Sequence, residues 1–175
     1  IVAEMSGNHN QSLECAKQIL EQAKRIGVDA VKIQTYTPET ITLDCDNKYF
    51  RIQDEGSLWH GETLFNLYKK AHTPWAWHRD LFEYARSLDL ILFSSPFDET
   101  AVDLLEKLDN PIYKIASFEV MDIQLVQRIA RTKKPTILSS GVATIGEIST
   151  AIKILKDHGV NDITLLHCIS SYPAP

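Results

Sequence analysis

Two lysines interrupt runs of apolar, mostly β-branched residues, and this makes them the strongest candidates for chemistry in the sequence. Lys32 stands in the run Val-Lys-Ile-Gln and Lys114 in the run Tyr-Lys-Ile-Ala-Ser. An ammonium group in such a run is costly to bury unless an anion meets it. The anion belongs either to a ligand or to an internal salt bridge, for which Glu4 and Glu119 are available. A third interpretation is a Schiff-base lysine, because burial makes a lysine nucleophilic.

Serines at the ends of other apolar runs favour the anion-binding interpretation. Ser95, Ser139 and Ser170 each end or follow such a run and offer hydroxyl donors. Ammonium and hydroxyl groups that converge on one place suit a ligand that carries a phosphate and a carboxylate. A single serine in this position is usually a turn residue, so only the set indicates a binding site.

Three other titratable residues lie close to the ends of apolar runs. Glu4 ends the first run, where a carboxylate can act as general acid or base or can form a structural ion pair. His9 and His167 suit proton transfer or metal binding, although a single histidine more often has a structural role. The six histidines show no paired metal-binding spacing, so the sequence indicates no strong metal site of its own.

Six short apolar runs alternate with segments of helical periodicity. This alternation predicts βαβ units and a parallel sheet. The strands are expected at residues 1–5, 30–35, 90–95, 112–117, 136–140 and 163–169.

Local signals mark the helices between these strands. Gly27 follows an amphipathic segment and is expected to end its helix. Thr73 and Pro74 suit the N-cap and first position of another helix, and Thr144 with Glu147 predicts a capping box. Further helices are expected over 62–71 and 98–108.

Polar residues follow nearly every expected strand, which favours a (β/α)8 TIM barrel over a doubly wound sheet. A barrel collects ligand contacts from the carboxyl ends of many strands, whereas a doubly wound sheet concentrates them at one switch point. Because a complete barrel has eight strands, we expect residues 1–175 to be an incomplete TIM-barrel catalytic domain. The first six strands are present, the last two are missing, and the sixth has an open edge. Residues 39–72 are expected to be an insertion after the second strand that contributes to substrate choice, or else a peripheral addition.

Composition limits the compartment and the partners. The chain is 44% hydrophobic and 23% charged, with a formal net charge of −5, which does not suit a nucleic-acid or anionic-membrane surface. It has no apolar run long enough for a membrane span and no signal-peptide pattern. Cys15, Cys45 and Cys168 are dispersed and form no disulfide pattern. We therefore expect a cytoplasmic protein with no nucleic-acid or membrane partner.

Five stretches, in chain order, make this sequence resemble the sialic acid synthase family, the nonulosonate synthases. They are residues 4–10 (EMSGNHN), 29–38 (DAVKIQTYTP), 93–98 (FSSPFD), 113–119 (YKIASFE) and 167–175 (HCISSYPAP). Within the family the sequence is most similar to the pseudaminic acid synthases. That similarity lies in residues 34–38 (QTYTP), in 43–47 (LDCDN), and in the insertion from 58–61 (LWHG) to 73–75 (TPW).

The resemblance implies a condensation of phosphoenolpyruvate with an N-acetylated amino sugar, here 2,4-diacetamido-2,4,6-trideoxy-L-altrose, to give pseudaminic acid and phosphate. Glu4 matches the catalytic carboxylate, and Glu119 and Tyr172 match positions that face the sugar. The residues at or near the phosphoenolpyruvate-binding positions are Lys32, Gln34, Ser95, Lys114, Ser117, Ser139 and Ser170. Ser95 stands where sialic acid synthases usually carry threonine and Ser170 where they carry asparagine, which suits a different sugar.

The resemblance also implies parts that residues 1–175 lack. The family holds a divalent metal, Mn2+ or Mg2+, with two histidines on later strands, so no metal ligand is expected in this chain. The C-terminal antifreeze-like domain is absent as well, and the complete enzyme is expected to be a homodimer. Three alternatives stay open: an N-acetylneuraminate or legionaminate synthase, a Schiff-base aldolase that uses Lys114 or Lys32, and a non-catalytic truncated barrel that binds anions or a partner chain.

Overall fold

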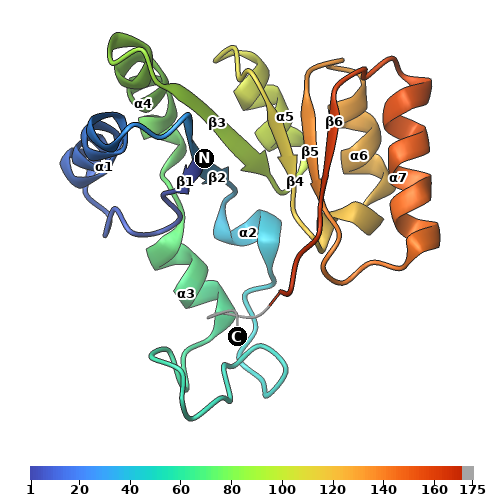
Figure 1. Ribbon diagram of the computed structural model, residues 1–175. Coiled ribbons are helices and arrows are strands. Elements are labelled where there is room, and N and C mark those ends of the chain that lie inside the picture. The colour runs from blue at the N-terminus through green and yellow to red at the C-terminus, as the bar shows by residue number, and fades with distance from the viewer. Residues whose placement is uncertain (171–175) are drawn as a thin grey trace. The chain divides into compact units, whose positions relative to one another are not determined.

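The computed structural model describes residues 1–170 of the chain, in which helices alternate with strands (Figure 1). The chain forms two compact units, Ile1–Ile91 and Leu92–Pro175. The first unit contains the expected insertion, and the second contains most of the expected strands.

The first unit has a pair of parallel strands and four helices. β1 (Val2–Glu4) pairs with β2 (Ala30–Thr35), and Glu4 lies opposite Lys32. The helices are α1 (Leu13–Ile26), α2 (Pro38–Ile41), α3 (Leu64–Ala71) and α4 (Trp75–Ser87). α1 and α4 lie side by side (Figure 1), and Leu20 and Leu81 on these helices are fully buried. The strand register thus places the Glu4 carboxylate, at the end of β1, beside Lys32 in the middle of β2.

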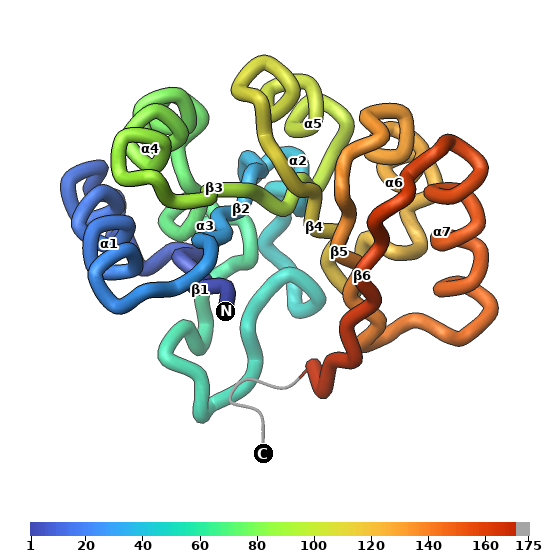
Figure 2. The backbone as a smooth tube through the Cα atoms, turned by 45° about the horizontal axis from the view of Figure 1, so that its top comes forward, coloured from blue at the N-terminus to red at the C-terminus, as the bar shows by residue number. Residues whose placement is uncertain are grey.

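In the second unit the strands pair in parallel and in chain order. They are β3 (Ile91–Pro96), β4 (Tyr113–Ile115), β5 (Thr136–Ser139) and β6 (Ile163–Leu166). The helices are α5 (Glu99–Glu106), α6 (Ile123–Ala130) and α7 (Ile145–Asp157), with a short 3-10 helix η1 (Glu119–Met121) after β4. α6 lies between α5 and α7 (Figure 2). Because the strands are parallel, the residues that follow them share one edge of the sheet.

All six expected strands are confirmed, with ends that differ from the expectation by at most three residues. Gly27 ends α1 as expected, with a φ of 78° that favours glycine. The capping box of Thr144 and Glu147 is present at the start of α7. The residues that form the helix end and the capping box are close together in the sequence, so local patterns are sufficient to predict both features.

The expected N-cap role of Thr73 is wrong. α4 begins at Trp75, Pro74 occupies the N-cap position, and no side chain caps the helix. The Thr73 hydroxyl lies 3.3 Å from His9 Nε2 instead, so a tertiary contact uses the group that the local pattern assigned to the helix. In the insertion, α3 begins at Leu64 after an N-cap by Thr63, two residues later than expected, and the short helix α2 was not expected.

A fully buried histidine, His78, joins α4 to β2. Its Nδ1 lies 3.1 Å from the Pro74 carbonyl and its Nε2 lies 2.9 Å from Thr35 Oγ1. The carbonyl oxygen requires a proton on Nδ1, so in the neutral ring Nε2 accepts a hydrogen bond from the Thr35 hydroxyl. Burial lowers the pKa of His78 to about 4, because the charged ring would lose its hydration. The ring is therefore neutral at pH 7.

We expect His78 to lower the free energy of unfolding by about 2 kcal/mol as the pH falls from 7 to 5. The ring of the unfolded chain takes up its proton near pH 6.5, whereas the folded chain takes up this proton only near pH 4. The stabilisation is thus complete above pH 6.5 and is lost as the pH falls toward 4. Urea unfolding at both pH values measures the slope, which His78→Gln should reduce and the exposed control His60→Gln should keep. An equal slope in both variants would contradict this assignment.

Candidate active site

Lys114 lies on β4 of the second unit and is only 8% exposed. Its Nζ donates hydrogen bonds to Ser139 Oγ at 2.5 Å and to the Ile115 carbonyl at 2.9 Å. β4 and β5 are parallel neighbours, which brings the lysine of one strand to the serine of the next. Two residues that the sequence assigned to one ligand therefore meet directly.

Ser117 and Ser170 flank Gly141 in the same unit. The Gly141 N–H donates to Ser117 Oγ at 3.2 Å. A Cβ atom at position 141 would collide with Ser170 Oγ and would lie 3.0 Å from Ser117 Oγ. Because Gly141 has no side chain, the Ser117 and Ser170 hydroxyl groups can both lie close to its backbone.

The pKa of the Cys168 thiol indicates the electrostatic environment near Lys114, Ser117 and Ser139. Burial alone would raise its pKa, but hydrogen bonds from the Ser139 hydroxyl and the Ser140 backbone, together with the charge of Lys114, lower it overall. A place that stabilises a thiolate also stabilises a bound anion. In the sequence, Cys168 is marked only by its place in the HCISSYPAP stretch, two residues before Ser170.

Three buried polar atoms of the second unit have no hydrogen-bond partner among the described residues. They are Ser95 Oγ, in a residue that is 1% exposed, Glu119 Oε2, and Asp98 Oδ2, which belongs to the carboxylate that caps α5. Burial raises the pKa of Glu119, and its own backbone N–H and the charge of Lys114 oppose this rise only in part. Since an unpaired buried polar atom is costly, Ser95 Oγ and Glu119 Oε2 are suited to contact a ligand.

In the first unit, Glu4 and Lys32 form an ion pair across β1 and β2. The Lys32 side chain is 16% exposed and that of Glu4 is 40% exposed. Ser6 Oγ donates to the other carboxylate oxygen of Glu4 at 3.0 Å. The salt-bridge interpretation of the two lysines is therefore confirmed for Lys32, whose partner is Glu4.

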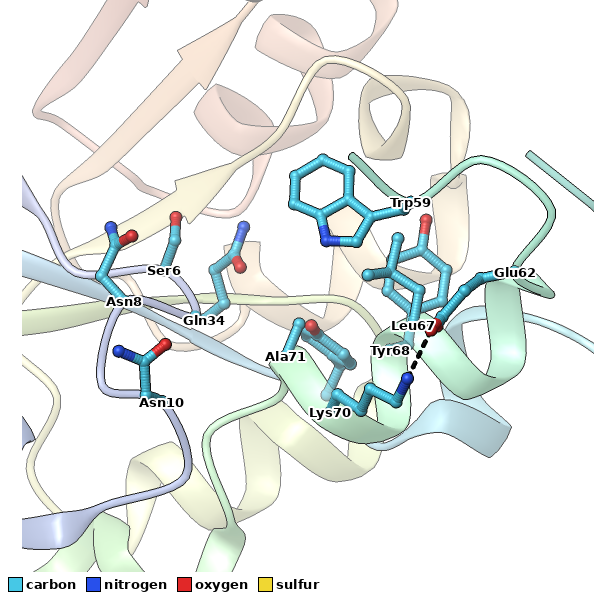
Figure 3. Close-up of a pocket in the computed structure, with 12 residues that line it drawn as sticks. Ser6, Asn8, Asn10, Gln34, Trp59, Glu62, Leu67, Tyr68, Lys70 and Ala71 are labelled. Atoms are coloured by element: carbon cyan, nitrogen blue, oxygen red, sulfur yellow. Dashed lines mark hydrogen bonds and ion pairs between the residues drawn. The ribbon is translucent and has the colours of Figure 1, made fainter. Parts of the chain in front are cut away.

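A pocket of about 490 Å³ in the first unit adjoins this ion pair (Figure 3). Ser6, which contacts Glu4, lines the pocket, and so does Gln34 of β2. The insertion supplies most of the other side of the pocket, through Trp59, Glu62, Leu67, Tyr68 and Lys70. Sequence reasoning predicted that the insertion contributes to a site but did not identify these residues, because their proximity to residues 6–10 depends on the tertiary fold.

His9 has a structural role. It is fully buried, its Nδ1 accepts from the Gln11 N–H at 3.1 Å, and its Nε2 lies 3.3 Å from Thr73 Oγ1. Burial, and secondarily the charge of His72, lower its pKa. Both ring nitrogens of His9 therefore contact other residues of the fold. His167, the other histidine that suited proton transfer or metal binding, is exposed.

Residues 1–170 do not fit the divalent metal that the resemblance implies. Within this part of the chain, no three His, Cys, Asp or Glu side chains form a group that could hold a metal ion. Tyr172, the second expected sugar contact, lies outside the described residues. None of the helices described is both long and apolar enough to cross a membrane.

Parallel strands that alternate with helices define an α/β protein, in which the residues that follow the strands share one edge of the sheet. The model of the NeuB family matches residues 19–175. The chain belongs to the NeuB family.

Individual relatives agree with this membership. The chain is 53% identical to the pseudaminic acid synthase of Helicobacter pylori over 99% of its own length and 51% of that protein. It is 45% identical to the pseudaminic acid synthase of Campylobacter jejuni, over 99% of the chain and 50% of the relative. The crystal structure of the N-acetylneuraminic acid synthetase of Leptospira borgpetersenii superimposes with a TM-score of 0.82 at 30% identity, covering 99% of this chain and 55% of that one. The chain thus spans about half the length of these relatives.

Proposed function

We propose that this chain forms the catalytic part of a nonulosonate synthase, which condenses phosphoenolpyruvate with an N-acetylated amino sugar and releases phosphate. The observation that carries the proposal is the second-unit cluster, in which Lys114 meets Ser139 and the environment favours negative charge. The identity to two pseudaminic acid synthases favours 2,4-diacetamido-2,4,6-trideoxy-L-altrose as the sugar and pseudaminic acid as the product.

In the proposed reaction, C3 of phosphoenolpyruvate attacks the aldehyde carbon of the open-chain sugar. A C–C bond forms, the aldehyde oxygen takes up a proton, and positive charge develops at C2. Water adds at C2 and loses a proton. The C2 hydroxyl group then passes its proton to the departing phosphate as the bond between C2 and the phosphate oxygen breaks, which leaves a carbonyl group at C2 and inorganic phosphate.

The residues of the chain bind, orient and transfer protons in this scheme. Lys114 and Lys32 offset the two acidic groups of phosphoenolpyruvate. The binding set is completed by Gln34, Ser95, Ser117, Ser139 and Ser170. Glu4, which contacts Lys32 and Ser6, takes the proton from the water that adds at C2. Glu119, whose Oε2 is buried without a hydrogen-bond partner among the described residues, is suited to contact the sugar.

The same proposal extends to the fold and the assembly of the complete protein. The six strands are the first six of a (β/α)8 barrel, and the TM-score of 0.82 to a sialic acid synthetase supports this. The complete enzyme is a cytoplasmic homodimer that uses Mn2+ or Mg2+.

A phosphate-release assay tests the proposed function. The complete gene product is incubated with phosphoenolpyruvate, Mn2+ and either the diacetamido sugar or the sugar precursors of N-acetylneuraminate and legionaminate. We expect release with the diacetamido sugar and little with the others. Release with another sugar alone would reassign the product, and no release with any sugar would contradict the synthase.

A further inference from the structure

The pocket of the first unit has two chemically different sides (Figure 3). Ser6 and the amide side chains of Asn8, Asn10 and Gln34 lie on one side. Trp59 lies on the opposite side, and 52% of this residue is exposed. The pocket therefore offers hydrogen bonds to one face of a ligand and an aromatic surface to the other.

Glu62 brings an unused hydrogen-bond acceptor to the pocket. Its Oε1 forms an ion pair with Lys70, whereas its Oε2 is buried and has no hydrogen-bond partner among residues 1–170. A buried carboxylate oxygen without a donor is costly, so it favours a ligand that carries an N–H or O–H group.

The charges at the pocket indicate a neutral ligand. The ammonium group of Lys70 balances the carboxylate of Glu62, and the other polar lining groups, those of Ser6, Asn8, Asn10 and Gln34, are uncharged. A phosphate or carboxylate would meet the unpartnered Glu62 oxygen and be repelled. The volume of about 490 Å³ lies in the range of small-molecule sites.

We propose that this pocket binds the end of the amino sugar remote from its aldehyde, and that Glu62 and Trp59 determine specificity for a sugar with two acetamido groups. Glu62 Oε2 accepts the N–H of the second acetamido group, and Trp59 packs against the methyl groups. Ser6 contacts both the pocket and Glu4, so a sugar in the pocket has its aldehyde on the side of Glu4. This inference rests on the proposed function, because it takes the sugar from it.

Kinetics with two sugars test the inference in the complete gene product. The substrates are the diacetamido sugar and an analogue with a hydroxyl group in place of the second acetamido group. We expect Glu62→Leu to raise the KM for the diacetamido sugar about tenfold or more, with a smaller effect on the analogue and none on the KM for phosphoenolpyruvate. Trp59→Ala should lower kcat/KM for both sugars. The exposed neighbours Glu55→Gln and Leu58→Ala are matched controls that should behave as wild type.

Saturation-transfer NMR with the diacetamido sugar separates this inference from the proposed function. Sugar binding that Glu62→Leu weakens supports the pocket even when no phosphate is released. Phosphate release by the wild type with unchanged kinetics in Glu62→Leu and Trp59→Ala would overturn the pocket and keep the synthase. Failure of the wild type to bind the sugar would overturn both.

Discussion

Lys114→Met is expected to lower kcat/KM for phosphoenolpyruvate by about 10²- to 10³-fold, the scale on which enzymes lose rate when one preorganised donor is removed. The ammonium group is 8% exposed and donates to Ser139, in an environment that lowers the pKa of the Cys168 thiol. Methionine keeps the length and apolar bulk of the side chain but leaves a bound anion without its cation. Initial rates of phosphate release measure the effect.

The folding of the variant must be separated from its chemistry. Because methionine leaves Ser139 Oγ and the Ile115 carbonyl without the Lys114 donor, the Tm of the variant is measured beside its rates to show that it is folded at the assay temperature. Lys107→Met, which changes an exposed lysine of the same unit, is the matched control. Wild-type kcat/KM in Lys114→Met would refute the assigned role. A borohydride-stable adduct of the wild type with pyruvate would instead indicate a Schiff-base lysine.

Glu4→Gln is expected to lower kcat by about 10²- to 10⁴-fold, the usual contribution of a general base. Glutamine preserves the shape of the side chain but cannot take a proton from the water at C2. The KM for phosphoenolpyruvate should change less than kcat, because Glu4 acts on the water. Steady-state kinetics at saturating sugar separate the two parameters.

The ion pair of Glu4 with Lys32 offers a competing explanation, in which Glu4 acts only by holding Lys32 in place to bind phosphoenolpyruvate. In that case Glu4→Gln would raise the KM for phosphoenolpyruvate and leave kcat near the wild-type value. We expect the opposite, a large loss in kcat with a smaller change in KM. Glu14→Gln, at an exposed acid of the same unit, should keep wild-type rates.

The sequence was sufficient to predict contacts that follow from strand order. Parallel pairing places Lys114 next to β5, so its approach to Ser139 could be anticipated from the positions of the two residues in their strands. Gly27 was equally predictable, because a left-handed residue after a helix is a local requirement.

Contacts between distant segments could not be read from local patterns. The Thr73 hydroxyl bonds His9 rather than capping α4, and nothing in the sequence around residue 73 indicates that partner. His78 looks like an ordinary helical residue until its burial and its contact with Thr35 are seen. The unpartnered oxygen of Glu62 likewise exists only in the folded pocket.

The fate of the bridging oxygen of phosphoenolpyruvate tests the proposed reaction most directly. The complete gene product is given phosphoenolpyruvate labelled with oxygen-18 between C2 and phosphorus, together with the diacetamido sugar, and both products are analysed by mass spectrometry. The proposed addition of water at C2 predicts that the label leaves in phosphate, because the C–O bond breaks. A label retained at C2 of the sugar acid would mean that the P–O bond breaks, and it would contradict the mechanism.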